Sequence, residues 1–299
     1  MNFRVLKAFL VVSRFGNITR ASEFLHISQP ALSRQIAELE AELDTRLFER
    51  TSRRLTLTAN GLLFESRARE LVKIYEEIRD ELRQAENEYT GLIRFGCVES
   101  SVVEFVIDVF TELMQHYPHL TFELYAADGD DIREALDHGN LDMGILLEPV
   151  EAAKYESIPL PWSDRWGIVV SENSPEAKLE NISIQQLSDM RLILPRRWIV
   201  QDEIASWMGI AREHLNVLMY HNLPTLPIRF VQKGIGAVLC VEGSYGVRPA
   251  AGTRFLPLSP EQRAGHRLVR RRNIKPSKVC RLVWDTAQKY VSAFAQVDE

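Results

Sequence analysis

Apolar residues near the start of the chain recur at helical spacing and predict two short helices joined by a tight turn. Asn17 is a suitable cap for the first helix and Ser28 for the second, whose first turn tolerates Pro30. The predicted buried stripes are Ile18, Ala21 and Leu25 in the first helix, and Leu32, Ile36, Leu39 and Leu43 in the second. A similar apolar row in residues 1–16 predicts a helix that precedes the pair.

The opposite face of the second helix is polar. Its first turns carry side chains that can donate to and accept from base edges and phosphates in a major groove, namely Gln29, Ser33, Arg34 and Gln35. An ordinary helical hairpin with a solvated face is the alternative. The positions of the caps, the turn and the apolar stripe favour a helix-turn-helix.

A basic hairpin is predicted after these helices. Leu47 and Phe48 form an apolar anchor, and residues 55–58 alternate as in a strand. Arg50, Arg53 and Arg54 lie between them, where they would reach phosphates or the neighbouring minor groove. Simple solvation is the alternative for such a run, but beside a helix-turn-helix we interpret it as a wing.

A long helix is predicted from about Thr58 to Tyr89, because no Gly or Pro follows Gly61. Its apolar positions step alternately by four and three, a heptad seam formed by Phe64, Ala68, Leu71, Tyr75, Ile78, Leu82, Ala85 and Tyr89. A helix of about 45 Å needs a partner along its length, which predicts a homodimer. Two heads related by a two-fold axis would read an interrupted inverted repeat. Packing on the chain's own C-terminal part is the alternative.

After Thr90 and Gly91 the pattern changes to alternating strands and helices. Strands are predicted at residues 92–97, 121–126 and from 141, with helices at 102–116 and 132–138. A second series runs from 165 to about 257, followed by a strand near Leu268 and a long helix from Pro276. This order favours parallel sheets flanked by helices, in two lobes with a cleft between them. The last elements could cross back to complete the first lobe.

Several motifs resemble the winged helix-turn-helix of LysR-type transcriptional regulators. They are Ala21-Ser22, Ser28 to Ile36 (SQPALSRQI), Leu47 to Arg50 (LFER) and Leu57 to Gly61 (LTANG). Asp44 stands where the family commonly has glycine, and Asp tolerates a left-handed backbone better than most residues. Ser22 replaces the usual second alanine. Residues 117–118, 141–145, 166–170 and 233–238 resemble, more loosely, the effector-binding domain of the same family.

The resemblance implies a multidomain α/β fold. We expect a winged helix-turn-helix DNA-binding domain at residues 1–58, a linker and dimerisation helix at 59–89, and an effector-binding domain at 90–299 that is similar to periplasmic binding proteins. Lobe I would hold about 90–161 and 265–299, and lobe II about 162–264. The implied function is a bacterial, sequence-specific transcription regulator modulated by a small-molecule effector. Its expected partners are double-stranded DNA, a second copy or a tetramer of this chain, the effector and RNA polymerase.

Candidate site residues follow from these motifs. For DNA they are Ser28, Gln29, Pro30, Ser33, Arg34, Arg50, Arg53 and Arg54. For the effector they are Ser100, Ser101, Arg196, Asn222 and Thr225. The two serines follow a strand and open a helix, where free backbone N–H groups favour an anion such as a carboxylate. Plain helix capping remains open for the serines and for Thr225, and a solvated surface for Arg196 and Arg197.

Charge and composition agree with a DNA-binding head on an acidic body. The net charge is −5, but residues 1–58 sum to +3 and the remainder to −8. The three cysteines have no paired spacing, so they predict neither a zinc site nor a disulfide framework. Neither a signal peptide nor an apolar run of membrane-spanning length is recognisable, so we expect a cytoplasmic protein. A basic run at 263–281 is interpreted as solvated surface, or else as a contact for another subunit or the polymerase.

An enzyme is the main rival interpretation. The sequence contains no paired carboxylates, nucleophile elbow, metal-binding spacing or phosphate loop, so we assign no catalytic residues, no metal and no cofactor. A cytoplasmic small-molecule-binding protein would explain the two lobes. Neither rival accounts for the helix-turn-helix.

Overall fold

The computed structural model describes residues 2–50, 55–83, 89–150, 152–272 and 274–295. They form two compact units that divide close to residue 87. None of the described helices has the length and apolar character needed to cross a membrane.

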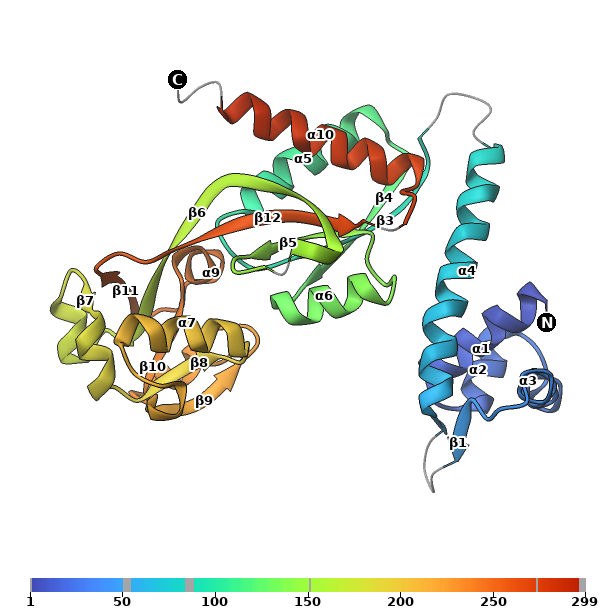
Figure 1. The fold of residues 1–299 in the computed structure, drawn as a ribbon, viewed down its shortest axis with the longest axis horizontal. Coiled ribbons are helices and arrows are strands. Elements are labelled where there is room, and N and C mark those ends of the chain that lie inside the picture. Colours follow the sequence, from blue (N-terminus) through green and yellow to red (C-terminus); the bar gives the residue numbers. More distant parts are fainter. Residues whose placement is uncertain (1, 51–54, 84–88, 151, 273, 296–299) are drawn as a thin grey trace. The chain divides into compact units, whose positions relative to one another are not determined.

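The N-terminal unit contains four helices and a small hairpin (Figure 1). Its elements are α1 (Phe3–Phe15), α2 (Ile18–Leu25), α3 (Gln29–Glu42), β1 (Phe48–Arg50), β2 (Leu55–Leu57) and α4 (Ala59–Arg83). The predicted caps are confirmed: Asn17 Oδ1 accepts from the Arg20 amide at 3.1 Å, and Ser28 Oγ from the Ala31 amide at 3.4 Å. Local side-chain chemistry therefore sets where both helices of the pair begin.

The core of this unit uses the predicted stripes with one exception. Its buried apolar residues include Phe9, Val12, Ala21, Leu32, Ile36, Leu39, Leu47 and Phe48. Leu43 was predicted to extend the stripe, and this is wrong, because it lies just past the end of α3 and is 37% exposed. The chain turns there through Asp44, whose φ of 48° is the left-handed conformation expected at that position.

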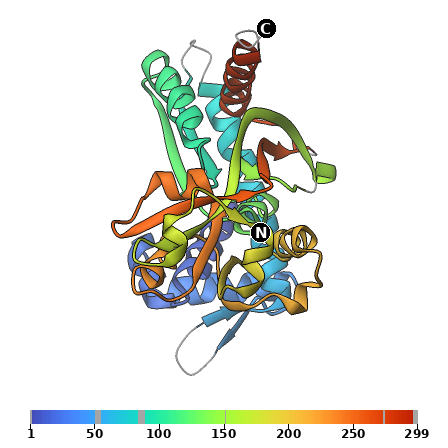
Figure 2. The same ribbon diagram turned by 90° about the vertical axis from the view of Figure 1, so that its left-hand side faces the viewer.

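The wing is an antiparallel hairpin in which Phe48 lies opposite Leu57, and Figure 2 shows its strands projecting from the helices of the unit. Glu40 Oε1 holds its start by accepting from the amides of Leu47 at 2.7 Å and Phe48 at 3.0 Å. Arg53 and Arg54, predicted at the tip, lie outside the described residues. Gly61 of α4 approaches the same turn so closely that a Cβ there would lie 2.1 Å from the Leu47 carbonyl oxygen.

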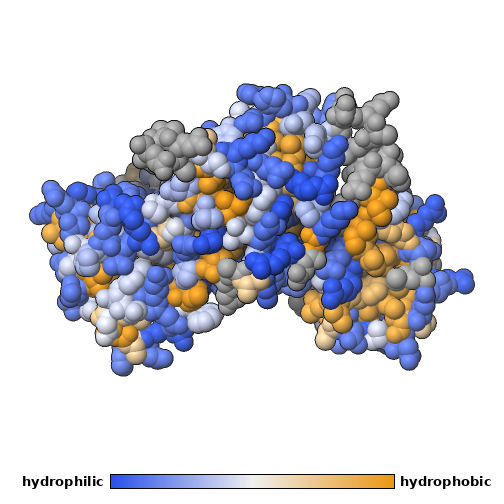
Figure 3. All heavy atoms as spheres, turned by 45° about the horizontal axis from the view of Figure 1, so that its top comes forward, coloured by the Kyte–Doolittle hydropathy of each residue, from blue (hydrophilic) through white to orange (hydrophobic). Residues whose placement is uncertain are grey.

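The seam predicted along α4 is divided between two faces. Its first positions serve the unit's own core, because the Phe64 ring packs on Phe9 with centroids 4.8 Å apart and Ala68 is buried. A neighbouring face stays uncovered and gathers apolar side chains (Figure 3); its residues Leu63, Leu71, Ile74 and Ile78 are 46–62% exposed. The seam was also predicted to reach Tyr89, which is wrong: Tyr89 is not helical and packs on Tyr117 in the second unit.

The second unit contains two lobes, as predicted, but their strands form one sheet with both parallel and antiparallel pairs instead of separate parallel sheets. Lobe I is built from β3 (Gly91–Cys97), α5 (Val103–His116), β4 (Leu120–Ala126), α6 (Gly129–Asp137) and β5 (Met143–Leu147). The long strand β6 (Tyr155–Ser171) leads into lobe II, which holds β7 (Ile182–Ser183), β8 (Leu192–Pro195), α7 (Trp198–Met208), β9 (Val217–His221), α8 (Ile228–Val231), β10 (Ala237–Val241), α9 (Glu242–Val247) and β11 (Thr253–Ser259). The chain returns through β12 (Arg263–Arg271) to α10 (Lys278–Ala295), which packs beside α5 and completes lobe I.

Strand order explains how the lobes are joined. The sheet runs β4-β3-β5-β12-β6-β10-β8-β9, with β11 paired to β6. The first part of β6 pairs antiparallel with β12, and its second part pairs with β10 and β11. Each lobe has its own core: one includes Ile93, Phe110, Ile145 and Trp284, and the other Trp166, Ile168, Leu194, Ile204 and Leu239. The carboxyl ends of the parallel strands in both lobes face the space between them.

The basic run at 263–281 is not simply solvated, which corrects our expectation. Arg267 Nε lies 2.8 Å from Glu148 Oε1, and Arg270 Nε lies 2.8 Å from Glu156 Oε2. The Arg270 guanidinium also lies over the Trp284 ring, 4.1 Å from its centroid. These arginines hold β12 to neighbouring strands and to α10.

Gly61→Ala should destabilise the DNA-binding unit by about 1–3 kcal/mol, because the added methyl group would displace the Leu47 carbonyl. Alanine is ordinarily a better helix former than glycine, so helix propensity alone would raise the free energy of unfolding. A decrease in that free energy would therefore indicate the steric contact with Leu47. Thermal unfolding of the full-length chain measures it. Gly246→Ala is the matched control, since that helical glycine has no atom within 4 Å of its Cβ position. Equal stability of Gly61→Ala and the natural chain would contradict the prediction.

Candidate functional site

The exposed face of α3 carries most of the residues predicted to contact DNA. Ser28, Gln29 and Pro30 are exposed, Ser33 is half-buried, and the Arg34 side chain is 82% exposed. Arg34 Nε donates to Glu38 Oε1 at 2.8 Å, and Gln29 Nε2 donates to Ser33 Oγ at 3.4 Å. An exposed ion pair between residues four apart in a helix contributes little, so Arg34 can exchange it for a base edge or a phosphate at small cost. Arg50 belongs to β1, at the start of the wing tip.

The second site is a cavity of about 70 Å³ between the two lobes. Segments that follow strands of lobe I supply Val98, Glu99, Ser100, Ala127, Asp128, Gly129 and Leu147. Lobe II supplies Trp166, Pro195, Arg197, Val200, His221, Asn222, Leu223, Pro224, Cys240, Val241 and Ser244. A concave space lined mainly by apolar groups and by a few polar groups is the usual form of a small-molecule site.

The structure brings together only part of the predicted effector set. Ser100 and Asn222 line the cavity, whereas Ser101, Arg196 and Thr225 do not. The Thr225 hydroxyl lies behind Glu99 and donates to its Oε2 at 3.4 Å. The Ser101 amide, expected to be free for an anion, donates to Asp164 Oδ2 at 3.1 Å.

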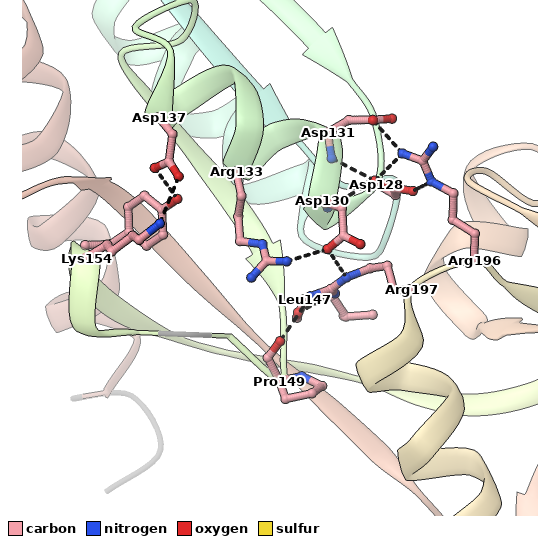
Figure 4. Close-up of polar contacts among 11 residues, drawn as sticks. Asp128, Asp130, Asp131, Arg133, Asp137, Leu147, Pro149, Lys154, Arg196 and Arg197 are labelled. Carbon is pink, nitrogen blue, oxygen red and sulfur yellow. Dashed lines mark hydrogen bonds and ion pairs between the residues drawn. The ribbon is translucent and has the colours of Figure 1, made fainter. Parts of the chain in front are cut away.

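Arg196 is engaged in an ion pair that neither of its predicted roles anticipated (Figure 4). Its Nε lies 2.6 Å from Asp128 Oδ2, and its Nη2 lies 2.5 Å from Asp131 Oδ1. Asp128 also accepts from the amides of Asp130 and Asp131, at 3.0 and 2.9 Å. Burial alone would raise the pKa of the Asp128 carboxyl, but these hydrogen bonds and the charge of Arg196 outweigh it and lower that pKa. The carboxylate therefore stays ionised.

Arg197 forms a second link between the lobes (Figure 4). Its buried guanidinium lies 3.0 Å from Asp130 Oδ1 and donates to the carbonyl oxygens of Leu147 and Pro149 at 3.4 and 3.3 Å. The absence of a side chain at Gly129 leaves room for the Arg197 guanidinium, because a Cβ there would lie 2.9 Å from Arg197 Nη1. The start of α6 in lobe I is thus joined to the end of β8 in lobe II by two arginines.

Two residues of the lining, Ser100 and Trp166, carry polar side-chain atoms that have no hydrogen-bond partner within the described part of the chain. The buried ring of His221 interacts with the backbone of Leu239. Burial lowers the pKa of His221 to about 4, so its ring is neutral at pH 7. Burial also raises the pKa of the Cys240 thiol to about 12, and burial together with the charge of Glu99 does the same for Cys97. These cysteines are thiols, not thiolates, at neutral pH.

Sequence reasoning missed Asp128 and His221 as site residues, whereas it named Arg197 beside Arg196 either as a source of charge in the cleft or as solvated surface. Each lies at or just after the carboxyl end of a strand, β4, β8 or β9. The rule that ligands bind beyond the carboxyl ends of parallel strands would have selected all three.

Comparison with known proteins identifies the family. The model described as "LysR substrate binding domain" matches residues 86–292, and that of "Bacterial regulatory helix-turn-helix protein, lysR family" matches residues 3–62. The chain is 27% identical over 237 residues to the HTH-type transcriptional regulator YybE of Bacillus subtilis (strain 168), which covers 79% of this chain and 81% of that protein. It is 28% identical over 194 residues to a hydrogen peroxide-inducible genes activator of Haemophilus influenzae, covering 65% of this chain and 64% of that protein.

A solved structure of full-length CbnR in complex with its target DNA has a similar fold. The TM-score is 0.71 at 20% sequence identity, over 98% of this chain and 99% of that one. Together with the family models, this likeness accounts for both units of the chain. The protein belongs to the LysR family: it is a DNA-binding transcription regulator with a helix-turn-helix domain and an effector domain of two α/β lobes, and it is not an enzyme.

Proposed function

We propose that this regulator binds an interrupted inverted repeat as a homodimer, and that a small molecule held between the lobes alters DNA binding or activation. The observation that carries the proposal is the cavity with unpartnered polar groups in a chain that also exposes a recognition helix. In this proposal residues 1–58 bind DNA, 59–89 pair two copies, and 90–299 bind the effector. Lobe I is taken as about 90–161 and 265–299, and lobe II as about 162–264. The protein would act in the cytoplasm, where bacterial DNA lies.

For DNA, Gln29, Ser33 and Arg34 would contact base edges or adjacent phosphates. The position of these residues on the first turns of α3, with Gln29 and Arg34 exposed, supports this role, since that end of a recognition helix enters the major groove. The backbone contacts would come from Ser28, Pro30, Arg50, Arg53 and Arg54.

For pairing, the uncovered face of α4 is the best supported surface. Leu63, Leu71, Ile74 and Ile78 form one row along the helix, and a row of this kind is stable in water only when another surface covers it. Lobe edges offer more apolar surface, including Leu124 and Tyr125 of β4. Such surfaces leave both a dimer and a tetramer open.

For the effector, Ser100 and Asn222 would make direct contacts from the cavity lining. Thr225 would act through Glu99, and Arg196 through Asp128, because these are the groups they contact. Ser101 could contribute only its hydroxyl, since its amide is engaged by Asp164. A ligand that wedges between the lobes would have to rearrange the two arginine links, which offers a physical route from binding to a change in lobe geometry.

Selection of sites from a random DNA library should enrich an interrupted inverted repeat with the natural chain, and this experiment tests the proposed function. Arg34→Ala should relax the preference at its base position by about 5–150-fold, the equivalent of 1–3 kcal/mol. Arg212→Ala is the control, because it removes an exposed, carboxylate-paired arginine of the effector domain. Unchanged selectivity of Arg34→Ala would remove α3 from the role of recognition helix.

Leu71→Asp should shift the protein toward monomer and weaken operator binding by at least about tenfold, because it places a charge in the proposed pairing face. Light scattering after size-exclusion chromatography measures the mass. Leu179→Asp, a change at another exposed leucine, should alter neither property. An unchanged oligomer for Leu71→Asp would exclude this face.

Hydrogen peroxide should leave operator binding unchanged, although one relative is named for induction by that oxidant. The Cys97 and Cys240 thiols, with a pKa of about 12, are ionised in only about one molecule in 10⁵ at pH 7, and the thiolate is the reactive form. The third cysteine, Cys280, is buried. Thiol titration of the native and unfolded chain, with binding assays before and after oxidation, checks this. Loss of binding that a reductant restores would argue for a redox sensor.

A further inference from the structure

The positions at which an anionic effector would be expected to bind are filled by the protein's own carboxylates. At the start of lobe I's first helix, Asp164 Oδ2 accepts from the Ser101 amide at 3.1 Å. At the start of α6, Asp128 Oδ1 accepts from the amides of Asp130 and Asp131 at 3.0 and 2.9 Å. Helix N-termini attract anions through these free amides, so occupied amides leave little to offer a carboxylate ligand.

The cationic side chain of the lining is also committed. Arg197 is 6% exposed and contacts Asp130 and two backbone carbonyls. The charge of Asp128 is paired with that of Arg196, whose Nε lies 2.6 Å from Asp128 Oδ2. His221 contributes no positive charge, because burial lowers its pKa to about 4.

Glu99 is the carboxylate of the lining that lacks a close partner. It is 8% exposed, and its described contacts are long: the Thr225 hydroxyl at 3.4 Å and Arg248 Nη2 at 3.4 Å. The Arg248 side chain is 61% exposed and therefore well solvated. A buried carboxylate normally accepts charge-assisted hydrogen bonds of about 2.7–2.9 Å, and Glu99 has none within the described chain.

Neutral polar groups line the same cavity as Glu99. Ser100 Oγ, in a residue 1% exposed, has no partner within the described residues, and the ring of His221, in a residue 8% exposed, interacts with the backbone of Leu239. Buried polar atoms of this kind are usually paired with water or a ligand. A hydroxyl and a neutral imidazole can each donate and accept, so they suit any polar group beside a cation.

We propose that the cleft selects a small cationic effector, whose protonated amine donates to the Glu99 carboxylate while Ser100 and His221 bind its neighbouring polar atoms. This deepens the proposed function and rests on it. The charge is opposite to the anion that the serines alone had suggested. The restricted space favours a compact amine, or one that opens the lobes as it enters.

Ligand pairs of matched shape and opposite charge test the proposal on the full-length protein. The probes are propylamine against propionate, putrescine against succinate, and benzylamine against benzoate. At least one amine should raise the melting temperature with a saturable dose dependence, and its matched carboxylate should not. Isothermal titration then gives the dissociation constant.

Glu99→Gln keeps the shape of the side chain and removes its charge, so it should weaken the amine by about tenfold or more. Glu172→Gln changes an exposed glutamate on lobe II and should leave the affinity unchanged. Melting of the unliganded variants shows whether either change merely disturbs folding. Rescue of the affinity by Glu99→Asp would further tie binding to the carboxylate.

Stabilisation by carboxylates instead of amines would overturn the proposal, as would equal amine affinity in Glu99→Gln and the natural chain. Failure of all three amines would overturn it too. The DNA selection described above requires no ligand. If the protein selects a DNA site but binds none of the amines, it is a regulator with a different class of effector; if it selects no DNA site, the proposed function itself is wrong.

Discussion

The effector domain depends on two strands that both lobes share. β6 pairs with β12 over one part of its length and with β10 and β11 over the other. The ladder between β6 and β12 has one irregularity, between Gly265 and His266, and a bulge of this kind bends a strand locally. Asp164 lies one register position away, opposite Ala264, and holds the Ser101 amide. Through Asp164, the strand that passes from one lobe to the other is hydrogen-bonded to Ser101, which adjoins the cavity residue Ser100.

Electrostatic pairing sets the relation of the lobes on the other side of that cleft. Asp128 and Asp130 of lobe I meet Arg196 and Arg197 of lobe II, and each pair joins one buried and one partly exposed side chain. Desolvation of the buried partner offsets part of the attraction, so we expect these pairs to specify geometry more than to add stability. A charged ligand placed among these four side chains would strengthen or weaken their ion pairs. Recognition of the ligand and the arrangement of the lobes are therefore coupled by one set of charges.

Features decided by near neighbours could be predicted from the sequence, and remote pairings could not. Asn17 and Ser28 cap their helices through amides three residues away, so their roles were legible. The pairing of Asp128 with Arg196 spans 68 residues and follows from the fold alone. Heptad spacing identified α4, but it could not tell which apolar face the head would cover, because Phe64 and Leu71 look alike in sequence. The continuity of β6 was hidden by Pro159 and Pro161, which usually interrupt strands.

Packing of Phe64 and Ala68 into the core of the head makes the first turns of α4 part of that head. α3 and the first turns of α4 therefore belong to one compact unit, in which Gly61 lies against the Leu47 carbonyl. The distance between two recognition helices in a pair would then be fixed by the register of the rods, in steps of about 5.4 Å for each helical turn. If α4 pairs two copies as proposed, residues up to Arg83 would determine the spacing of the two half-sites, and a chimera that exchanges the effector domain would keep that spacing.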